Sequence, residues 1–145
     1  MIAVDTNILV YAHRRDSAWH DAAFACMKEV AEDSAPWMVP QPCLHEFLAI
    51  VTHPRIYNPP STAAAAIEQA GNWLESPSLV LQGESSRHWR TLTDVIGRAK
   101  IVGPAIHDAR IAAICLDHGV RVLWTADRDF SRFAGLRVEN PLVNA

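Results

Sequence analysis

The chain has 145 residues, of which half are hydrophobic and a fifth are charged, and its formal net charge is −3 with a pI near 6.1. This length predicts one domain that buries about 68–70% of the surface of its unfolded chain, so folding needs no disulfide or structural metal. No run approaches the ~18 apolar residues of a membrane span. The acidic balance argues against a protein that coats nucleic acid by charge alone, so any such contact must use local basic groups or bound cations.

The N-terminal stretch MIAVDTNILVYAH places an aspartate inside its only apolar run and has no basic leader, so we do not expect a signal peptide. Cys26, Cys43 and Cys115 form no CxxC pair and lie in apolar helical contexts. This pattern predicts reduced core thiols in a cytoplasmic protein. We therefore expect a single domain over residues 1–145, with no membrane segment.

The first predicted element is a short strand over residues 2–4 that ends at Asp5, after which the apolar pattern resumes over residues 8–11 as a helix. On one interpretation the strand delivers Asp5 to a functional site at its carboxyl end. On the other, Asp5, Thr6 or Asn7 is simply a helix N-cap, since all three residue types accept hydrogen bonds from the free N–H groups of a helix start. Both interpretations stay open at this point.

Helical and strand patterns alternate along the rest of the chain. In the first half we predict helices over 18–32 and 43–51, a strand over 37–39, a rigid proline-rich loop over 53–60, and a helix that begins with a cap at Ser61. In the second half we predict strands over 79–81 and 120–124, a helix over 86–99 with Trp89, Leu92, Val95 and Ile96 facing inward, and a helix from His107 that Gly119 ends as a left-handed residue. This alternation predicts an α/β fold, in which helices flank both faces of a central parallel sheet in three α/β/α layers.

Two acidic residues lie on faces that should otherwise be apolar. Asp108 shares its helical face with Ile111 and Cys115, and Glu46 shares its face with Cys43. Asp and Glu are rarely buried unless they are paired or bind a metal. We therefore interpret both carboxylates as functional.

Four carboxylates are expected to converge. Asp5 ends the first strand and Asp127 follows the last predicted strand, so both fall at the edge of the sheet where ligands bind in parallel α/β folds, and Glu46 and Asp108 stand early in their helices. Carboxylates brought this close repel and raise one another's pKa, whereas a hard divalent cation stabilises them. Oxygen ligands without histidine or thiolate suit Mg²⁺ or Mn²⁺. The chemistry implied is metal-assisted phosphodiester cleavage.

These motifs resemble those of the PIN-domain nucleases and, within them, the VapC-type toxins of bacterial type II toxin–antitoxin pairs. The resemblance rests on DTN at Asp5, HEF at Glu46, HDARIAA at Asp108, TADRDF at Asp127 and Asp129, and FAGLRVENPL, which follow in the same order over essentially the whole chain. It implies a PIN-like fold and a magnesium-dependent endoribonuclease, in which manganese can substitute, that a cognate VapB-type antitoxin neutralises. It also suggests a homodimer.

The same resemblance places Asp5, Glu46, Asp108 and Asp127 at the acidic positions of the family. Thr6, Asn7 and Thr125 match polar positions that support the carboxylates. Asp127 and Asp129 both compete for the fourth acidic position. We assign Asp127 to the metal site, because it lies nearer the end of the strand, and Asp129 to capping the short helical turn that follows.

Three other functions are weighed against the nuclease. A phosphatase of the haloacid dehalogenase type also has an N-terminal strand ending in aspartate, but it needs a second aspartate where this chain has Asn7. A phospho-receiver domain needs a late lysine after a strand, and neither Lys28 nor Lys100 has that place. A catalytically idle RNA- or protein-binding module on the same fold has no physical need to keep four acids facing inward.

Two basic clusters could contact RNA or could be solvated helix faces. One comprises Arg14 and Arg15, and the other comprises Arg87, His88, Trp89 and Arg90. Arginines there could follow a phosphate backbone, with some base stacking, although Trp89 is expected in the core.

Overall fold

The computed structural model describes residues 1–143 and contains one five-stranded sheet. Its strands are β1 (Ile2–Val4), β2 (Trp37–Pro40), β3 (Leu79–Gln82), β4 (Val122–Trp124) and β5 (Arg137–Glu139). They lie in the order β3-β2-β1-β4-β5, and every neighbouring pair is parallel. The predicted parallel sheet is therefore confirmed, with β5 as a strand that we did not predict.

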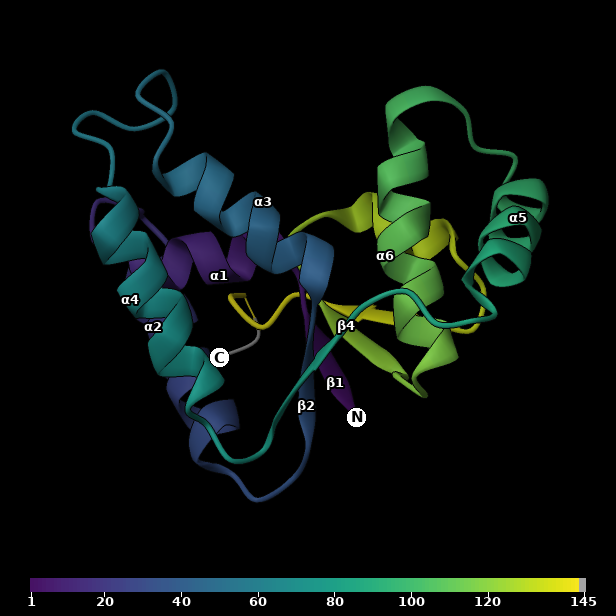
Figure 1. Cartoon of the computed structure of the whole chain (residues 1–145), viewed down its shortest axis with the longest axis horizontal. Helices are drawn as coiled ribbons and strands as arrows, with labels where there is room; N and C mark the ends of the chain where they lie inside the picture. Colours follow the sequence, from purple (N-terminus) through teal and green to yellow (C-terminus); the bar gives the residue numbers. More distant parts are fainter. Residues whose placement is uncertain (144–145) are drawn as a thin grey trace.

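Helices cover both faces of this sheet (Figure 1). They are α1 (Thr6–His13), α2 (His20–Glu32), α3 (Gln41–Val51), α4 (Ala63–Leu74), α5 (His88–Ala99) and α6 (Ile106–Asp117), with short 3₁₀ turns η1 (Gly103–Ala105) and η2 (Arg128–Arg132). In Figure 1, α1 to α4 lie on one side of the strands, and α5 and α6 lie on the other. The three-layer α/β/α prediction is confirmed.

The path of the chain explains the layers. From β1 to β2 to β3 the chain moves in one direction across the sheet, and right-handed crossovers place α1 to α4 on one face. From β3 the chain returns past β1 to reach β4, so the crossover through α5 and α6 falls on the opposite face. The direction reverses between β1 and β4, and ligands bind parallel α/β sheets in the crevice at such a point.

The core lies between the sheet and its two helix layers. The fully buried large side chains include Leu9 of α1, Trp37 and Met38 of β2, Phe47 of α3 and Ile114 of α6. Both faces of the sheet thus contribute to one connected apolar cluster. Across residues 1–143, no helix combines the length and the apolarity that a membrane crossing requires.

The structure corrects one position of the inward stripe that we predicted for α5. Leu92, Val95 and Ile96 pack against the core as expected, but Trp89 is 76% exposed, whereas His88 is buried. The covered face therefore begins at His88, which lies one turn before Leu92. The helix begins at His88 and packs on α6, and this contact turns Trp89 outward despite its apolar ring.

Three further local predictions can be compared with the structure. Thr62, not Ser61, caps α4, because its hydroxyl accepts a hydrogen bond from the backbone N–H of Ala65 at 3.1 Å. Gly119 does have the left-handed conformation expected after α6, with φ of +75°. Glu46 does not face the core, since the buried positions of α3 are Cys43, Phe47 and Val51.

Candidate active site

Asp5 stands at the carboxyl end of β1, the place that the functional interpretation of the DTN motif expects, and it is the N-cap of α1, so the capping interpretation is confirmed. Its carboxylate accepts a hydrogen bond from the backbone N–H of Thr6 at 2.8 Å and one from the hydroxyl of Thr125 at 2.7 Å. The thiol of Cys43 donates a third, at 3.5 Å. Asp5 is only 5% exposed, and this burial raises its pKa, while the three hydrogen bonds act in the opposite direction.

The hydroxyl of Thr125 joins the two sequence motifs that flank the switch point. Besides donating to Asp5, it accepts from the side-chain amide of Asn7 at 3.1 Å and from the backbone N–H of Asp127 at 3.0 Å. The amide oxygen of Asn7 in turn accepts from the backbone N–H of Ala126 at 3.2 Å. One donor and two acceptors use the full capacity of a threonine hydroxyl, so this buried residue fixes the geometry of the loop after β4.

Glu46 and Asp108 are held more loosely, from α3 and α6. Glu46 accepts one long hydrogen bond of 3.3 Å from the hydroxyl of Thr6. Asp108 stands in the first turn of α6, where its carboxylate lies 3.7 Å from the guanidinium of Arg132. Both carboxylates are at least partly open to solvent.

Asp127, which we assigned to the metal site, takes the capping role that we assigned to Asp129. Its carboxylate accepts a hydrogen bond from the backbone N–H of Asp129 at 2.9 Å, so Asp127 itself is the N-cap of η2. The predicted cap at Asp129 is therefore wrong, because the turn begins at Arg128, two residues earlier than a turn capped by Asp129 would begin. Asp129 is exposed and lies outside the lining of the pocket formed by the other acids.

These residues meet in one pocket of about 270 Å³ at the β1/β4 switch point. The predicted residues that line it are Asp5, Thr6, Asn7, Glu46, Asp108 and Asp127. Thr125 stands behind Asp5, and the remaining lining is mainly apolar. Four segments that are distant in the sequence thus supply four carboxylates to one hollow.

The donor set fits a hard divalent cation. Desolvation raises the pKa of Asp108 most, and the negative charges of Asp127, Glu46 and Asp129 raise it further, against the opposing effect of Arg132. Concentrated carboxylate oxygens suit Mg²⁺ or Mn²⁺, and Cys43 offers no competing thiolate because burial raises the pKa of its thiol. Within residues 1–143 no three acidic, histidine or cysteine side chains are already arranged to enclose an ion.

Comparison with known proteins identifies the family. The PIN domain family matches residues 2–136. This chain belongs to the PIN domain family. Ribonuclease VapC43 of Mycobacterium tuberculosis is 32% identical over 142 residues, which cover 98% of this chain and 96% of that relative. Ribonuclease VapC48 of the same organism is 28% identical over 94% of both chains.

Solved structures agree on the fold of this PIN domain. VapBC2 from Rickettsia felis, bound to a DNA fragment from its promoter, superposes with a TM-score of 0.71 at 19% identity, over 97% of this chain and 98% of that chain. VapC20 of Mycobacterium tuberculosis, a toxin that cleaves the sarcin–ricin loop, superposes with a TM-score of 0.67 at 19% identity, over 94% and 99%. Family membership favours the nuclease prediction over the phosphatase and phospho-receiver alternatives.

Proposed function

We propose that this chain is a magnesium-dependent endoribonuclease, a VapC-type toxin whose cleavage of RNA a cognate VapB-type antitoxin inhibits. The observation that carries the proposal is the pocket at the switch point, which gathers Asp5, Glu46, Asp108 and Asp127. The 32% identity to a VapC ribonuclease over nearly the whole chain supports it. We also propose that residues 1–145 form one PIN domain.

The four carboxylates would hold the cation. Mg²⁺ bound there would lower the pKa of an attacking water and neutralise charge on the phosphate. Asp5 would be the fixed ligand, because Thr6 and Thr125 orient its two oxygens. Glu46 and Asp108 can adjust, since each has only one weak polar partner among the described residues.

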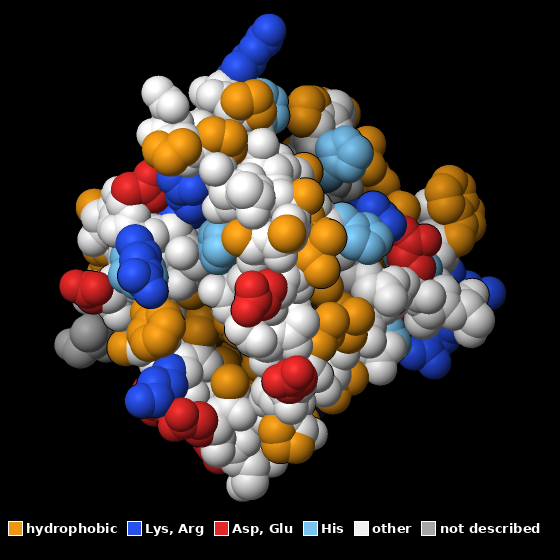
Figure 2. All heavy atoms as spheres, turned by 60° about the vertical axis from the view of Figure 1, so that its left-hand side comes forward, with side chains coloured by type: hydrophobic (Ala, Val, Ile, Leu, Met, Phe, Trp, Pro, Cys, Tyr) orange, Lys and Arg blue, Asp and Glu red, His pale blue; other side chains and the backbone are white. Residues whose placement is uncertain are grey.

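Two protein partners are proposed, the antitoxin and a second copy of this chain. An antitoxin that places an arginine near the pocket would pair bidentately with the carboxylates. A surface suited to protein contact lies elsewhere, where Phe24 of α2 and Ile67 and Leu74 of α4 are between 45% and 62% exposed. Figure 2, which turns this side toward the viewer, shows hydrophobic side chains among scattered charges. An exposed apolar patch of this kind favours a protein partner.

Cleavage of total cellular RNA tests the enzymatic proposal. We expect cleavage with Mg²⁺, restoration by Mn²⁺ after chelation, and loss in Asp108→Asn. Asp21→Asn is the matched control, because Asp21 also stands in the first turn of a helix but is exposed and does not line the pocket. No metal-dependent cleavage by the intact chain would favour the idle binding module.

Co-expression tests the partner. The product of the adjacent reading frame should relieve toxicity, and persistent toxicity beside a well-expressed neighbour would contradict the antitoxin proposal.

A further inference from the structure

We propose that the apolar half of the pocket seats a nucleobase of the RNA against the ring of Tyr57, and that Arg14 positions this ring. The inference rests on the proposed function, because it names a substrate contact in the same pocket. It makes Tyr57 a substrate-binding residue beside the carboxylates and Arg14 a positioning residue.

The lining of the pocket combines two kinds of side chain. The first kind is the carboxylates with the polar groups beside them. The second kind is apolar or aromatic: Ile111 and Phe130 lie on α6 and η2, beside the carboxylates, whereas Val10 and Tyr11 of α1, Ile50 of α3 and Tyr57 of the loop between α3 and α4 form the part that we call the apolar half. A cation and a phosphate need no apolar wall. In RNA the apolar surfaces are the faces of the bases, which stack on aromatic side chains.

The size of the pocket limits what can enter. Its volume of about 270 Å³ is slightly below the roughly 300–1,000 Å³ typical of small-molecule sites. A space of this size suits one nucleotide unit, with its phosphate toward Asp5 and Asp108 and its base toward Tyr57. The base recognised would thus belong to a nucleotide at the cleaved bond.

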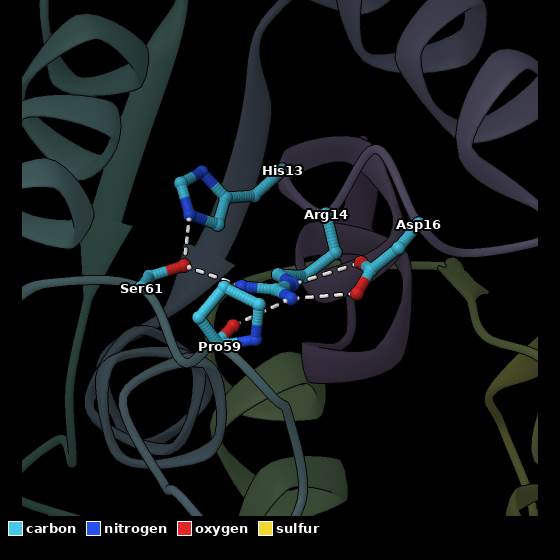
Figure 3. A network of polar contacts seen from close by, with 5 residues as sticks. All are labelled: His13, Arg14, Asp16, Pro59 and Ser61. Atoms are coloured by element: carbon cyan, nitrogen blue, oxygen red, sulfur yellow. Dashed lines mark hydrogen bonds and ion pairs between the residues drawn. The ribbon is translucent and has the colours of Figure 1, made fainter.

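A polar network at the end of α1 joins His13, Arg14, Asp16, Pro59 and Ser61 (Figure 3), and its arginine contacts the ring of Tyr57. The guanidinium of Arg14 lies over this ring, 4.3 Å from its centroid. The same guanidinium donates two hydrogen bonds to Asp16, at 2.9 and 2.6 Å, one to the carbonyl of Pro59 at 2.9 Å and one to the hydroxyl of Ser61 at 3.2 Å. These hydrogen bonds hold the loop between α3 and α4 in place next to the ring of Tyr57.

These contacts argue against both interpretations of Arg14 that the sequence left open. Its side chain is only 11% exposed, so it is neither a solvated surface group nor free to follow a phosphate backbone. Arg14 covers one face of the Tyr57 ring, and Tyr57 also lines the pocket, so the proposal places the base on the opposite face of the ring. The cation–π contact with Arg14 favours this placement of the ring.

The rest of the loop is closed by backbone contacts. The N–H of Tyr57 donates to the carbonyl of His53 at 3.0 Å, and the N–H of Ser61 donates to the carbonyl of Val51 at 2.8 Å. His13 adds a side-chain contact to the hydroxyl of Ser61 at 2.9 Å. The loop that carries Tyr57 is therefore ordered by hydrogen bonds. A substrate-binding ring that is already held in place loses less conformational entropy when the substrate binds.

Binding is measured first, without any need for cleavage. Ten-nucleotide homopolymers of A, C, G and U are titrated against Asp108→Asn protein in Mg²⁺, with fluorescence anisotropy as the readout. Adding Tyr57→Leu, which keeps an apolar side chain but removes the ring, should weaken binding of the preferred homopolymer by about 5–150-fold, the usual worth of one stacked base. Adding Tyr57→Phe should leave binding unchanged. Trp19→Leu, which removes an exposed aromatic ring outside the pocket by the same kind of substitution, is the control and should change nothing.

Unchanged binding after Tyr57→Leu would overturn the proposal, and so would equal losses in Tyr57→Phe and Tyr57→Leu or no binding of any homopolymer. Melting curves of each variant show whether the fold is kept. If RNA binding depends on Tyr57 but the intact chain never cleaves RNA, the enzymatic proposal fails and the base-stacking proposal stands. If the chain cleaves RNA and Tyr57→Leu leaves the KM and the cut sites unchanged, only the base-stacking proposal fails.

A double-mutant cycle in the cleavage-competent chain tests the role of Arg14. Arg14→Lys keeps the charge but loses the planar fork, so it should raise KM with little change in kcat at saturation. Because Arg14 acts through Tyr57, Arg14→Lys combined with Tyr57→Leu should be no worse than Tyr57→Leu alone. Additive effects on KM would overturn the positioning role.

Discussion

The two sides of the acidic pocket differ in how firmly they hold their carboxylates. On the β1/β4 side, Asp5 is 5% exposed and accepts three hydrogen bonds. On the α3/α6 side, Glu46 has one hydrogen bond of 3.3 Å, and Asp108 has one ion pair of 3.7 Å. One side is thus fixed by the fold, and the other can follow the ligand. Substitutions on the first side should reduce stability and activity together, whereas those on the second should reduce activity without loss of stability.

The largest expected effect is on the open side, in Asp108→Asn. Cleavage should fall by more than the roughly 10–100-fold typical of losing a group that only orients a ligand. The fold should survive, because the carboxylate has no polar partner in the described chain other than Arg132. Measured turnover near that of Asp21→Asn under saturating Mg²⁺ would contradict the assignment of Asp108.

The same variant should show a pH-dependent gain in metal-free stability. The fold raises the pKa of Asp108 above its ordinary 3.8, so the folded state binds this proton more tightly than the unfolded state does. The carboxylate is therefore destabilising once it ionises. The melting temperature of Asp108→Asn relative to the wild type should rise as pH increases from 3.8 through the raised pKa and then level off. A constant difference across this range would contradict the raised pKa.

The largest effect on stability is expected on the fixed side, in Thr125→Val. This change keeps the shape but removes one hydrogen-bond partner from each of Asp5, the side-chain amide of Asn7 and the backbone N–H of Asp127. We expect a loss of about 2 kcal/mol in the free energy of unfolding and a fall in cleavage of about 10–100-fold. Thr93→Val removes an exposed hydroxyl from α5 and is the control. Chemical denaturation and turnover measure both effects; a stable but inactive Thr125→Val would show that the two sides do not differ in this way.

A smaller effect is expected for Glu46→Gln, and it should appear only when metal is present. Millimolar Mg²⁺ or Mn²⁺ should raise the melting temperature of the wild type, because a ligand that binds only the folded state stabilises it. Glu46→Gln should reduce this rise while leaving the metal-free melting temperature unchanged, since Glu46 has one long hydrogen bond. An unaltered metal-induced rise would remove Glu46 from the cation site.

The smallest effects separate Asp127 from Asp129. Asp127→Asn should weaken cleavage but keep the cap, since asparagine is an equally good N-cap, whereas Asp127→Ala should also lose about 1 kcal/mol. Asp129→Ala should change neither cleavage nor stability much, because Asp129 is exposed and does not cap the turn. Turnover and melting of the three variants decide this, and an inactive but stable Asp129→Ala would reverse the assignment.

The sequence by itself determined the parallel α/β class, because the alternation of helical and strand patterns is local. It also predicted the four acids that the pocket gathers, from their places at strand ends and helix starts, whereas their polar neighbours were implied by the family resemblance. It could not place β5, since Arg137 to Glu139 is too short and too polar to be recognised as a strand until β4 lies beside it. The exposure of Trp89 and of Glu46 depended on which partner each helix packs against.

Only the tertiary structure decided how the site is assembled. The strand order puts β4 beside β1, which brings Thr125 within 2.7 Å of an aspartate 120 residues away. The tertiary structure also places the loop of Tyr57 over the end of α1, where Arg14 covers the ring. No local pattern encodes these contacts, because they arise from the pairing of elements that are distant along the chain.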